Sequence, residues 1–207
     1  MKKLESSITN MVLVLVGVAL ITGCILAYVN HVTEGPIKEQ AAKTLADGIK
    51  SVMGGVELTV EKSDSVKQEI KGKEFVFVVH KTVDANKNDL GVAIESTTGG
   101  FGGDLKVLVG FDKDGNILGY TILQHAETPG LGAKADKWFQ KDGKGNIIGK
   151  NPGKDNLTVK KDGGDVDAIT ASTITSRAFL LAVTQAYNAY SAIPVDANTA
   201  ATGQNAK

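Results

Sequence analysis

The chain has 207 residues and 42% hydrophobic residues, enough for one domain of common size with additional segments. Its 23 basic and 23 acidic residues balance and no lysine–arginine block stands out, so we expect no nucleic-acid partner. The single cysteine, Cys24, excludes an intrachain disulfide and a cysteine-based iron–sulfur or zinc site within one chain. Three widely separated histidines give no reason to expect a metal site.

An apolar run without charged residues occupies positions 11–29. As a helix, its 19 residues would span about 28 Å at ~1.5 Å per residue, close to the thickness of a bilayer core. Lys2 and Lys3 precede the run and few basic residues follow it closely, which predicts a cytoplasmic N-terminus. We therefore expect a short cytoplasmic segment (1–10), a transmembrane anchor (11–29) and an exported remainder.

Residues 21–24 also resemble a lipoprotein processing box, with Cys24 as the lipidated residue. The apolar run continues past this point, which favours an uncleaved anchor. Lipidation of Cys24 nevertheless stays open as an alternative.

A second helix is predicted after the anchor, within a linker that covers residues 30–72. Thr33 and Pro36 are typical of a helix start, and Gly54 with Gly55 is typical of a helix end. Apolar residues recur on one face of this helix at positions 37, 41, 45, 49 and 52. This pattern predicts an amphipathic helix that packs on a sheet.

Four strands are predicted at residues 75–80, 90–94, 105–111 and 117–123, where β-branched and apolar residues dominate. Residues 112–116 have the composition of a hairpin turn between the last two strands. An uninterrupted helical pattern follows at 177–190. We expect an α+β domain over residues 73–191, built on an antiparallel sheet with flanking helices, and a disordered tail at 192–207.

Hydroxyl residues gather directly before that last helix, among them Thr170, Ser172, Thr173 and Thr175. Serine and threonine often cap helices, which is the simplest explanation of the cluster. The unpaired N–H groups of a helix N-terminus also bind phosphate. The cluster is therefore a candidate phosphate site.

Two loops further upstream combine glycine with residues that contact ligands. Residues 98–103 place Phe101 among four glycines, and residues 125–132 read His-Ala-Glu-Thr-Pro-Gly-Leu-Gly. Glycine allows a backbone to approach a ligand closely, although it is equally common in plain turns. Thr128 to Leu131 fit a type II turn, with Pro129 and Gly130 in the central positions.

The three motifs together resemble the FMN-binding domain family. That family attaches FMN through a phosphoester to the last residue of Asp-x-x-(Ser/Thr)-Gly-Ala-Thr. Here Asp167, Thr170 and Thr173 match, while Ala171 replaces Gly and Ser172 replaces Ala. The glycine loop and the His-x-Glu-Thr-Pro-Gly-Leu-Gly segment match the family in order and spacing. The layout is most similar to the G subunits of Rnf-type complexes, to which the C subunits of Na⁺-translocating NADH:quinone reductase are related.

The resemblance implies one covalent FMN per chain on Thr173, attached by a flavin transferase, with Thr175 and Ser172 as alternative acceptors. His125 is expected to orient its loop. The other expected cofactor contacts are Ser172, Thr170, Asp167, Thr175, Glu127, Thr128, Gly130, Leu131 and Gly102. We expect no metal site, because the histidines are widely separated. We expect no catalytic residue, because no Ser/His/Asp arrangement stands in a sequence context typical of catalysis.

The implied function is electron transfer as one part of a multi-subunit translocase in the bacterial cytoplasmic membrane, not independent catalysis. The complex would move electrons between ferredoxin and NAD, and its other membrane subunits would transport Na⁺ or H⁺. Two alternatives remain open. The domain could be a membrane-tethered flavin sensor that passes no current, or an exported scaffold without a cofactor.

Overall fold

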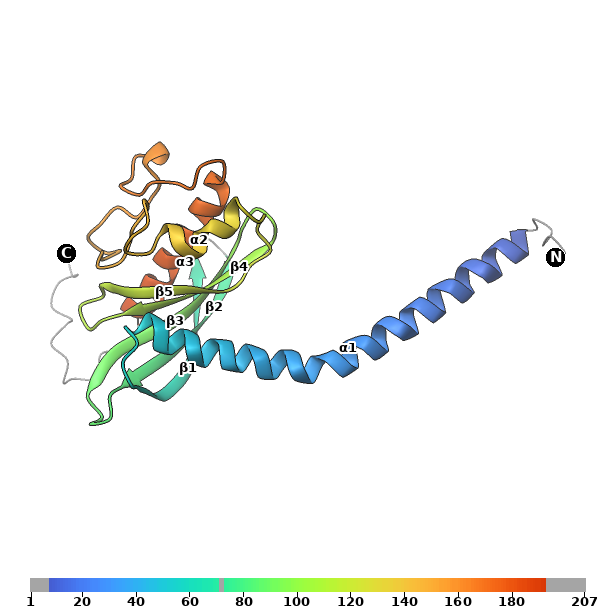
Figure 1. Cartoon of the computed structure of the whole chain (residues 1–207), viewed down its shortest axis with the longest axis horizontal. Helices are drawn as coiled ribbons and strands as arrows, with labels where there is room; N and C mark the ends of the chain where they lie inside the picture. The colour runs from blue at the N-terminus through green and yellow to red at the C-terminus, as the bar shows by residue number, and fades with distance from the viewer. Residues whose placement is uncertain (1–7, 71–72, 193–207) are drawn as a thin grey trace. The chain divides into compact units, whose positions relative to one another are not determined.

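The structure is a computed structural model that describes residues 8–70 and 73–192 (Figure 1). The predicted tail therefore lies outside the described residues except for Ala192, and so do residues 1–7 of the predicted cytoplasmic segment. The chain consists of two compact units, of which the first ends at Thr44 and the second begins at Leu45.

The N-terminal segment forms one helix, α1 (Ile8–Val52). Its most apolar 18-residue window has a mean hydropathy of 2.7, so the helix is long and apolar enough to cross a membrane. The separate helix start predicted at Thr33 and Pro36 is absent, because α1 continues through Pro36. A proline inside a helix removes one backbone hydrogen bond, and the turns on both sides stay helical here.

The end of α1 attaches to the domain. Ile49, Val52 and Met53 are buried in a small cluster with Ala93 and Leu108 on one face of the sheet. The helix stops where the sequence predicted, because the following glycines, Gly54 and Gly55, have φ angles of 85° and 73°.

Five antiparallel strands form a sheet in the order β1-β2-β3-β4-β5. Their bounds are β1 (Thr59–Ile70), β2 (Lys73–Val83), β3 (Asp89–Gly99), β4 (Asp104–Phe111) and β5 (Ile117–Gln124). The predicted antiparallel α+β fold is confirmed, and the four predicted strands lie within β2 to β5. No strand is predicted from the sequence at β1, because this edge strand consists mostly of polar residues.

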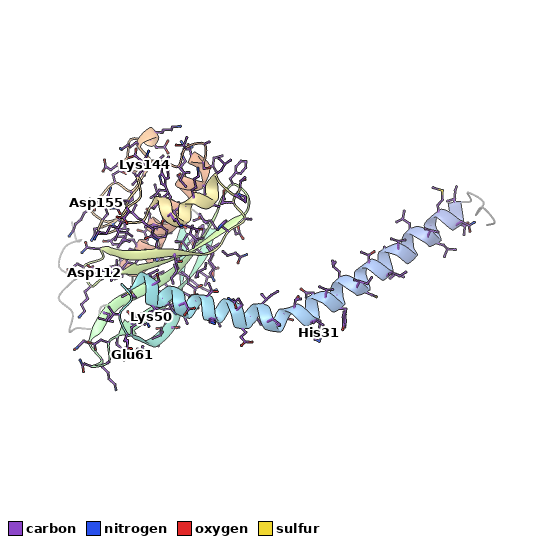
Figure 2. All side chains as sticks on the ribbon, in the orientation of Figure 1. His31, Lys50, Glu61, Asp112, Lys144 and Asp155 are labelled. Atoms are coloured by element: carbon purple, nitrogen blue, oxygen red, sulfur yellow. The ribbon has the colours of Figure 1, made fainter. Side chains whose placement is uncertain are left out.

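Aspartates close two of the hairpins in the same way. Asp112 Oδ1 accepts hydrogen bonds from the backbone N–H groups of Asp114 and Asn116, at 2.9 and 2.8 Å (Asp112 is labelled in Figure 2). Asp84 Oδ1 accepts two such bonds in the β2–β3 loop. The predicted turn at residues 112–116 is therefore confirmed, with a side-chain mechanism that fixes it.

The opposite face of the sheet carries α3 (Thr173–Ser191) and the main hydrophobic core. Phe179 of α3 stacks on Phe139 at a centroid distance of 4.3 Å and meets Tyr120 edge-on at 4.7 Å. The predicted helix at 177–190 lies within α3, which begins four residues earlier.

The long connection from β5 to α3 contains three short helices. These are η1 (Gly132–Lys134), α2 (Ala135–Trp138) and η2 (Lys160–Asp162). Tyr120 of β5 donates a hydrogen bond from its hydroxyl to the Ala135 carbonyl at 2.6 Å, and burial raises the pKa of this hydroxyl well above its ordinary value. This bond ties α2 to the sheet and so fixes the loop that precedes it.

Candidate cofactor site

Glu127 joins the three motifs that the sequence analysis selected. One carboxylate oxygen, Oε1, accepts the backbone N–H groups of Phe101 and Gly102 at 2.7 and 3.2 Å. The other, Oε2, accepts the hydroxyl of Thr175 at 2.6 Å. Glu127 is only 6% exposed, so it connects the glycine loop, its own loop and the first turn of α3 from inside the domain.

Glycines make this convergence possible. A Cβ atom at Gly100 would lie 2.2 Å from Glu127 Oε1, and one at Gly132 would lie 2.4 Å from Glu127 Oε2. At Gly102 it would lie 2.0 Å from the Ala126 carbonyl oxygen. A side chain at Gly100 or Gly132 would displace the Glu127 carboxylate, and one at Gly102 would displace the backbone of the Glu127 loop.

The Thr128–Leu131 segment forms the turn that its sequence predicted. The Leu131 N–H donates to the Thr128 carbonyl at 3.1 Å, and Gly130 has a φ angle of 76° at the third position. His125 Nδ1 accepts the N–H of Glu127 at 3.1 Å, so His125 contacts its own loop as expected. Thr128, Pro129 and Gly130 remain exposed at the surface of the domain.

The hydroxyl residues at the start of α3 differ in their surroundings. Thr175 is 1% exposed and bonded to Glu127. Ser176 is buried, donates to the Ser172 carbonyl at 3.0 Å and accepts the Ile169 N–H at 2.9 Å. Ser172 is buried and makes no side-chain capping bond.

Thr173 is the first residue of α3, and its side chain is partly exposed. Within residues 8–70 and 73–192, its hydroxyl has no hydrogen-bond partner. The unpaired N–H groups of the first turn of a helix lie beside it. Helix capping does not account for Thr173, because the N-cap residue is Ser172.

A tight turn leads into Thr173. The Ser172 N–H donates to the Ile169 carbonyl at 3.0 Å, with Thr170 and Ala171 between them. Ala171 has a φ angle of 61°, in the left-handed region that favours glycine. This alanine occupies the motif position where glycine is usual. The backbone therefore has the left-handed conformation that glycine favours, although the residue is alanine.

Asp167 contributes to the site through both its backbone and its side chain. Its carbonyl accepts the indole N–H of Trp138 at 2.8 Å, and its carboxylate pairs with Lys160 at 2.8 Å. These contacts hold the 167–173 segment against α2 and η2. A bidentate pair between Arg177 and Asp162, at 2.7 Å for each bond, adds a second attachment of η2 to α3 and lowers the pKa of Asp162.

Exposed apolar side chains surround this arrangement. Phe101 is 68% exposed, Leu131 is 40% exposed and Ile174 is 53% exposed. Each is adjacent in sequence to a residue that lies against Glu127 or Thr175, so the three side chains lie around the contact between Glu127 and Thr175. Apolar side chains that gather beside a few polar groups can form the lining of a ligand site.

An open cleft of about 490 Å³ begins at Gly130 and runs along α2. Trp138 lines it together with two aspartates and three lysines, namely Asp136, Asp142, Lys134, Lys137 and Lys144 (Lys144 is labelled in Figure 2). Its volume is within the range of small-molecule sites. These residues are not predictable as a site from the sequence, since lysines spread over a loop form no motif.

The sequence of the chain is similar to known proteins. The model of the FMN-binding domain family matches residues 100–188, which contain residues 100–103 of the glycine loop and the other two motifs in full. A relative from Shewanella amazonensis, named as the G subunit of an ion-translocating oxidoreductase complex, is 32% identical over 88% of this chain and 87% of its own length. A protein of the same name from Shewanella baltica is 35% identical over 81% and 82%.

The chain belongs to the family of G subunits of ion-translocating oxidoreductase complexes. Another relative, from Acetobacterium woodii, is named as the G subunit of a Na(+)-translocating ferredoxin:NAD(+) oxidoreductase complex and is 30% identical over 86% of this chain and 89% of its own length. The resemblance found in the sequence is therefore confirmed. As a member of this family, the protein transfers electrons as one part of a multi-subunit complex.

Two solved structures also match at low similarity. NqrC from Shewanella oneidensis is 22% identical over 61% of this chain and 64% of its own, with a TM-score of 0.44. The C subunit of the Na(+)-translocating NADH-quinone reductase from Parabacteroides distasonis is 19% identical over 82% and 97%, with a TM-score of 0.49.

Proposed function

We propose that this protein carries one FMN, bound covalently through a phosphoester to the Thr173 hydroxyl. The observation that carries the proposal is the contrast among the hydroxyls before and within α3. Thr175 and Ser176 are buried and already bonded, whereas the Thr173 hydroxyl is free of partners among the described residues. A covalent acceptor must be reachable and uncommitted, which favours Thr173 over Thr175 and the buried Ser172.

The residues present fit a phosphate at this position. The open N–H groups of α3 and its dipole favour a negative charge beside Thr173. The turn through Ala171 keeps the backbone close to that point. The phosphoester forms between the Thr173 oxygen and the flavin phosphate only if another group leaves that phosphate, so a flavin transferase would supply a flavin nucleotide that carries such a leaving group.

The surrounding residues would hold the flavin ring. Leu131 and Phe101 offer apolar cover, and the exposed Thr128–Gly130 turn offers backbone groups beside the cleft. Glu127 is a positioning residue in this arrangement, since both of its oxygens are used by protein donors. When bound, FMN supplies the capacity to accept and donate electrons, and the protein sets its position and surroundings.

We further propose the role of the protein in its complex. It passes electrons within an Rnf-type chain between ferredoxin and NAD, while partner subunits transport Na⁺ or H⁺. The apolar part of α1 contains no charged residue between positions 11 and 29, so it offers no ion path of its own. The domain after α1 lies on the exported side of the cytoplasmic membrane, as the lysines before α1 favour.

The attachment is tested with the full chain produced in cells that contain a flavin transferase. The denatured protein is examined by intact mass and in-gel flavin fluorescence, with Thr173→Ala, Thr175→Ala and Thr170→Ala as variants. We expect one FMN in the parent, its loss only in Thr173→Ala, and no loss in the other two. Retention of FMN in Thr173→Ala, or unmodified parent chains despite an active transferase, would overturn the proposed link.

The role and the orientation need separate measurements. Membranes from cells with only Thr173→Ala should lose ferredoxin:NAD⁺ activity, whereas unchanged activity after deletion of the flavinylated protein would favour the sensor alternative. For orientation, a Lys154→Cys variant in a Cys24→Ser background should react with a membrane-impermeant maleimide in intact spheroplasts. Reaction only after lysis would put the domain in the cytoplasm.

A further inference from the structure

A polar row crosses four strands on the sheet face that also holds the end of α1. Ser63 of β1 lies opposite His80 of β2, and the Ser63 Oγ to His80 Nδ1 distance is 2.8 Å. His80 Nε2 lies 2.8 Å from Glu95 Oε1 of β3. Lys106 of β4 pairs with the other oxygen of Glu95 at 2.5 Å.

The row has a defined direction of hydrogen bonding. Although burial alone would raise the pKa of Glu95, the bonds from His80 and Lys106 hold this pKa below its ordinary value. Glu95 is therefore an ionised acceptor at neutral pH, so in the imidazole form of His80, which has one ring proton, that proton lies on Nε2. The lone pair on Nδ1 then accepts a hydrogen bond from the Ser63 hydroxyl. A serine and its general base have the same arrangement in serine hydrolases.

The serine is accessible and its base is not. His80 is 4% exposed, whereas Ser63 is exposed on β1. Among the described residues β1 has a neighbouring strand on one side only, so backbone N–H groups on its free edge are available to a carbonyl oxygen. A bulge between Val60 and Lys62 distorts the strand next to Ser63, and bulges are frequent beside reactive side chains (Glu61, at the bulge, is labelled in Figure 2).

We propose that Ser63 is an activated nucleophile that takes up an acyl group from a carboxylic ester with a good leaving group. Ser63 Oγ forms a bond to the ester carbonyl carbon, and the bond from that carbon to the leaving oxygen breaks. The Ser63 proton passes to His80 Nδ1 and from there to the leaving alcohol, so no oxidant or metal is required. Glu95 is a positioning residue that fixes the His80 tautomer, and Lys106 acts through Glu95.

The chain provides a matched control on the same strand. Ser65 is also exposed and points to the same face, but its register partner is Val78 instead of a histidine. A purely structural role for the row predicts equal reactivity at both serines. An activated Ser63 predicts selective reaction.

The experiment treats the full chain in detergent with p-nitrophenyl acetate and follows p-nitrophenolate release, with peptide mapping of the acetylated residue. We expect a burst of one equivalent at Ser63, absent in Ser63→Ala and retained in Ser65→Ala. General-base catalysis contributes about 100-fold or more, so His80→Gln should slow Ser63 acetylation by at least about that factor. FMN content should be the same in all of these variants.

Equal acetylation of Ser63 and Ser65 in the parent would overturn the proposal, as would a parent-like rate in a folded His80→Gln variant. If His80→Gln does not fold, Glu95→Gln decides. It should slow acetylation of Ser63 about tenfold or more because the tautomer is no longer fixed, and an unchanged rate would refute the assignment.

Discussion

The Thr175 hydroxyl donates a 2.6 Å hydrogen bond to Glu127 Oε2 and thereby joins two segments that lie 48 residues apart in the sequence. Both side chains are almost fully buried. The bond fixes the first turn of α3, where Thr173 lies, relative to the loop that carries the Thr128–Leu131 turn. Thr175, two residues after the Asp167–Thr173 motif, therefore holds the site together, whereas Thr173 is the proposed FMN acceptor.

This division predicts opposite phenotypes at the two threonines. Thr175→Val leaves a buried carboxylate oxygen without its donor and should lower the free energy of unfolding by about 1.5–3 kcal/mol, with FMN attachment retained. Thr173→Val removes a hydroxyl without a partner and should change stability by less than about 0.5 kcal/mol, while FMN attachment is lost. Chemical denaturation and in-gel fluorescence measure the two properties. Loss of FMN in a stable Thr175→Val variant would contradict the division.

Glu127→Ala should be among the more destabilising changes in the domain. It leaves the N–H groups of Phe101 and Gly102 and the Thr175 hydroxyl without an acceptor, for an expected loss of about 2–4 kcal/mol. Glu127→Gln should recover most of this loss, because an amide can accept two N–H groups and donate to a hydroxyl. The matched control is Glu61→Ala at the exposed edge strand. Equal melting temperatures of Glu127→Ala and Glu61→Ala would refute the role.

The sequence predicted the parts of the fold in which local pattern and tertiary structure agree. Strands β2 to β5 carry apolar runs, and α3 has an uninterrupted helical pattern, so each was found. Strand β1 was missed because an edge strand exposed to water needs few apolar residues. The sequence predicts a helix start at Pro36, and this prediction is wrong because α1 tolerates one lost hydrogen bond there and continues through the proline.

The candidate site was predictable as motifs but not as contacts. Thr173, Glu127 and Gly102 were selected individually, whereas the hydrogen bonds that join them depend on how β3, β4 and α3 meet. The cleft along α2 carried no motif. The pairing of Ser63 with His80 and of His80 with Glu95 follows from strand register, over separations of 17 and 15 residues, and was missed for that reason.

Two glycines of the β3–β4 hairpin differ in how closely other atoms approach them, which allows a matched test of the contact between Gly102 and the Glu127 loop. Gly102→Ala would put a Cβ atom 2.0 Å from the Ala126 carbonyl oxygen and should destabilise the domain by about 1–3 kcal/mol. Gly99→Ala is the control, because nothing lies within 4 Å of a Cβ there. We expect Gly102→Ala to lower FMN incorporation as well, since the Glu127 loop must move. Similar stabilities of the two variants would contradict the contact.

Acid should weaken the domain partly through Glu95. Its pKa in the folded protein lies below the ordinary value of 4.5, because the bonds from His80 and Lys106 outweigh the effect of burial. A lowered pKa contributes stability above the unfolded-state value, and this contribution is lost as the pH falls through the folded-state value. The free energy of unfolding should therefore fall more steeply below pH 4.5 in the parent than in Glu95→Gln. Parallel curves would show that Glu95 is not the group responsible.

Ala171 offers the most direct test of the turn that presents Thr173. Its φ angle of 61° costs an alanine about 1 kcal/mol relative to glycine, partly offset by the greater flexibility of glycine in the unfolded chain. Ala171→Gly should therefore raise the free energy of unfolding by about 0.5 kcal/mol and leave FMN attachment intact. Ala168→Gly, three residues earlier and without a positive φ, should lower it by a similar amount. If both substitutions destabilise equally, Ala171 does not hold the left-handed conformation, and the backbone in front of Thr173 follows a different path.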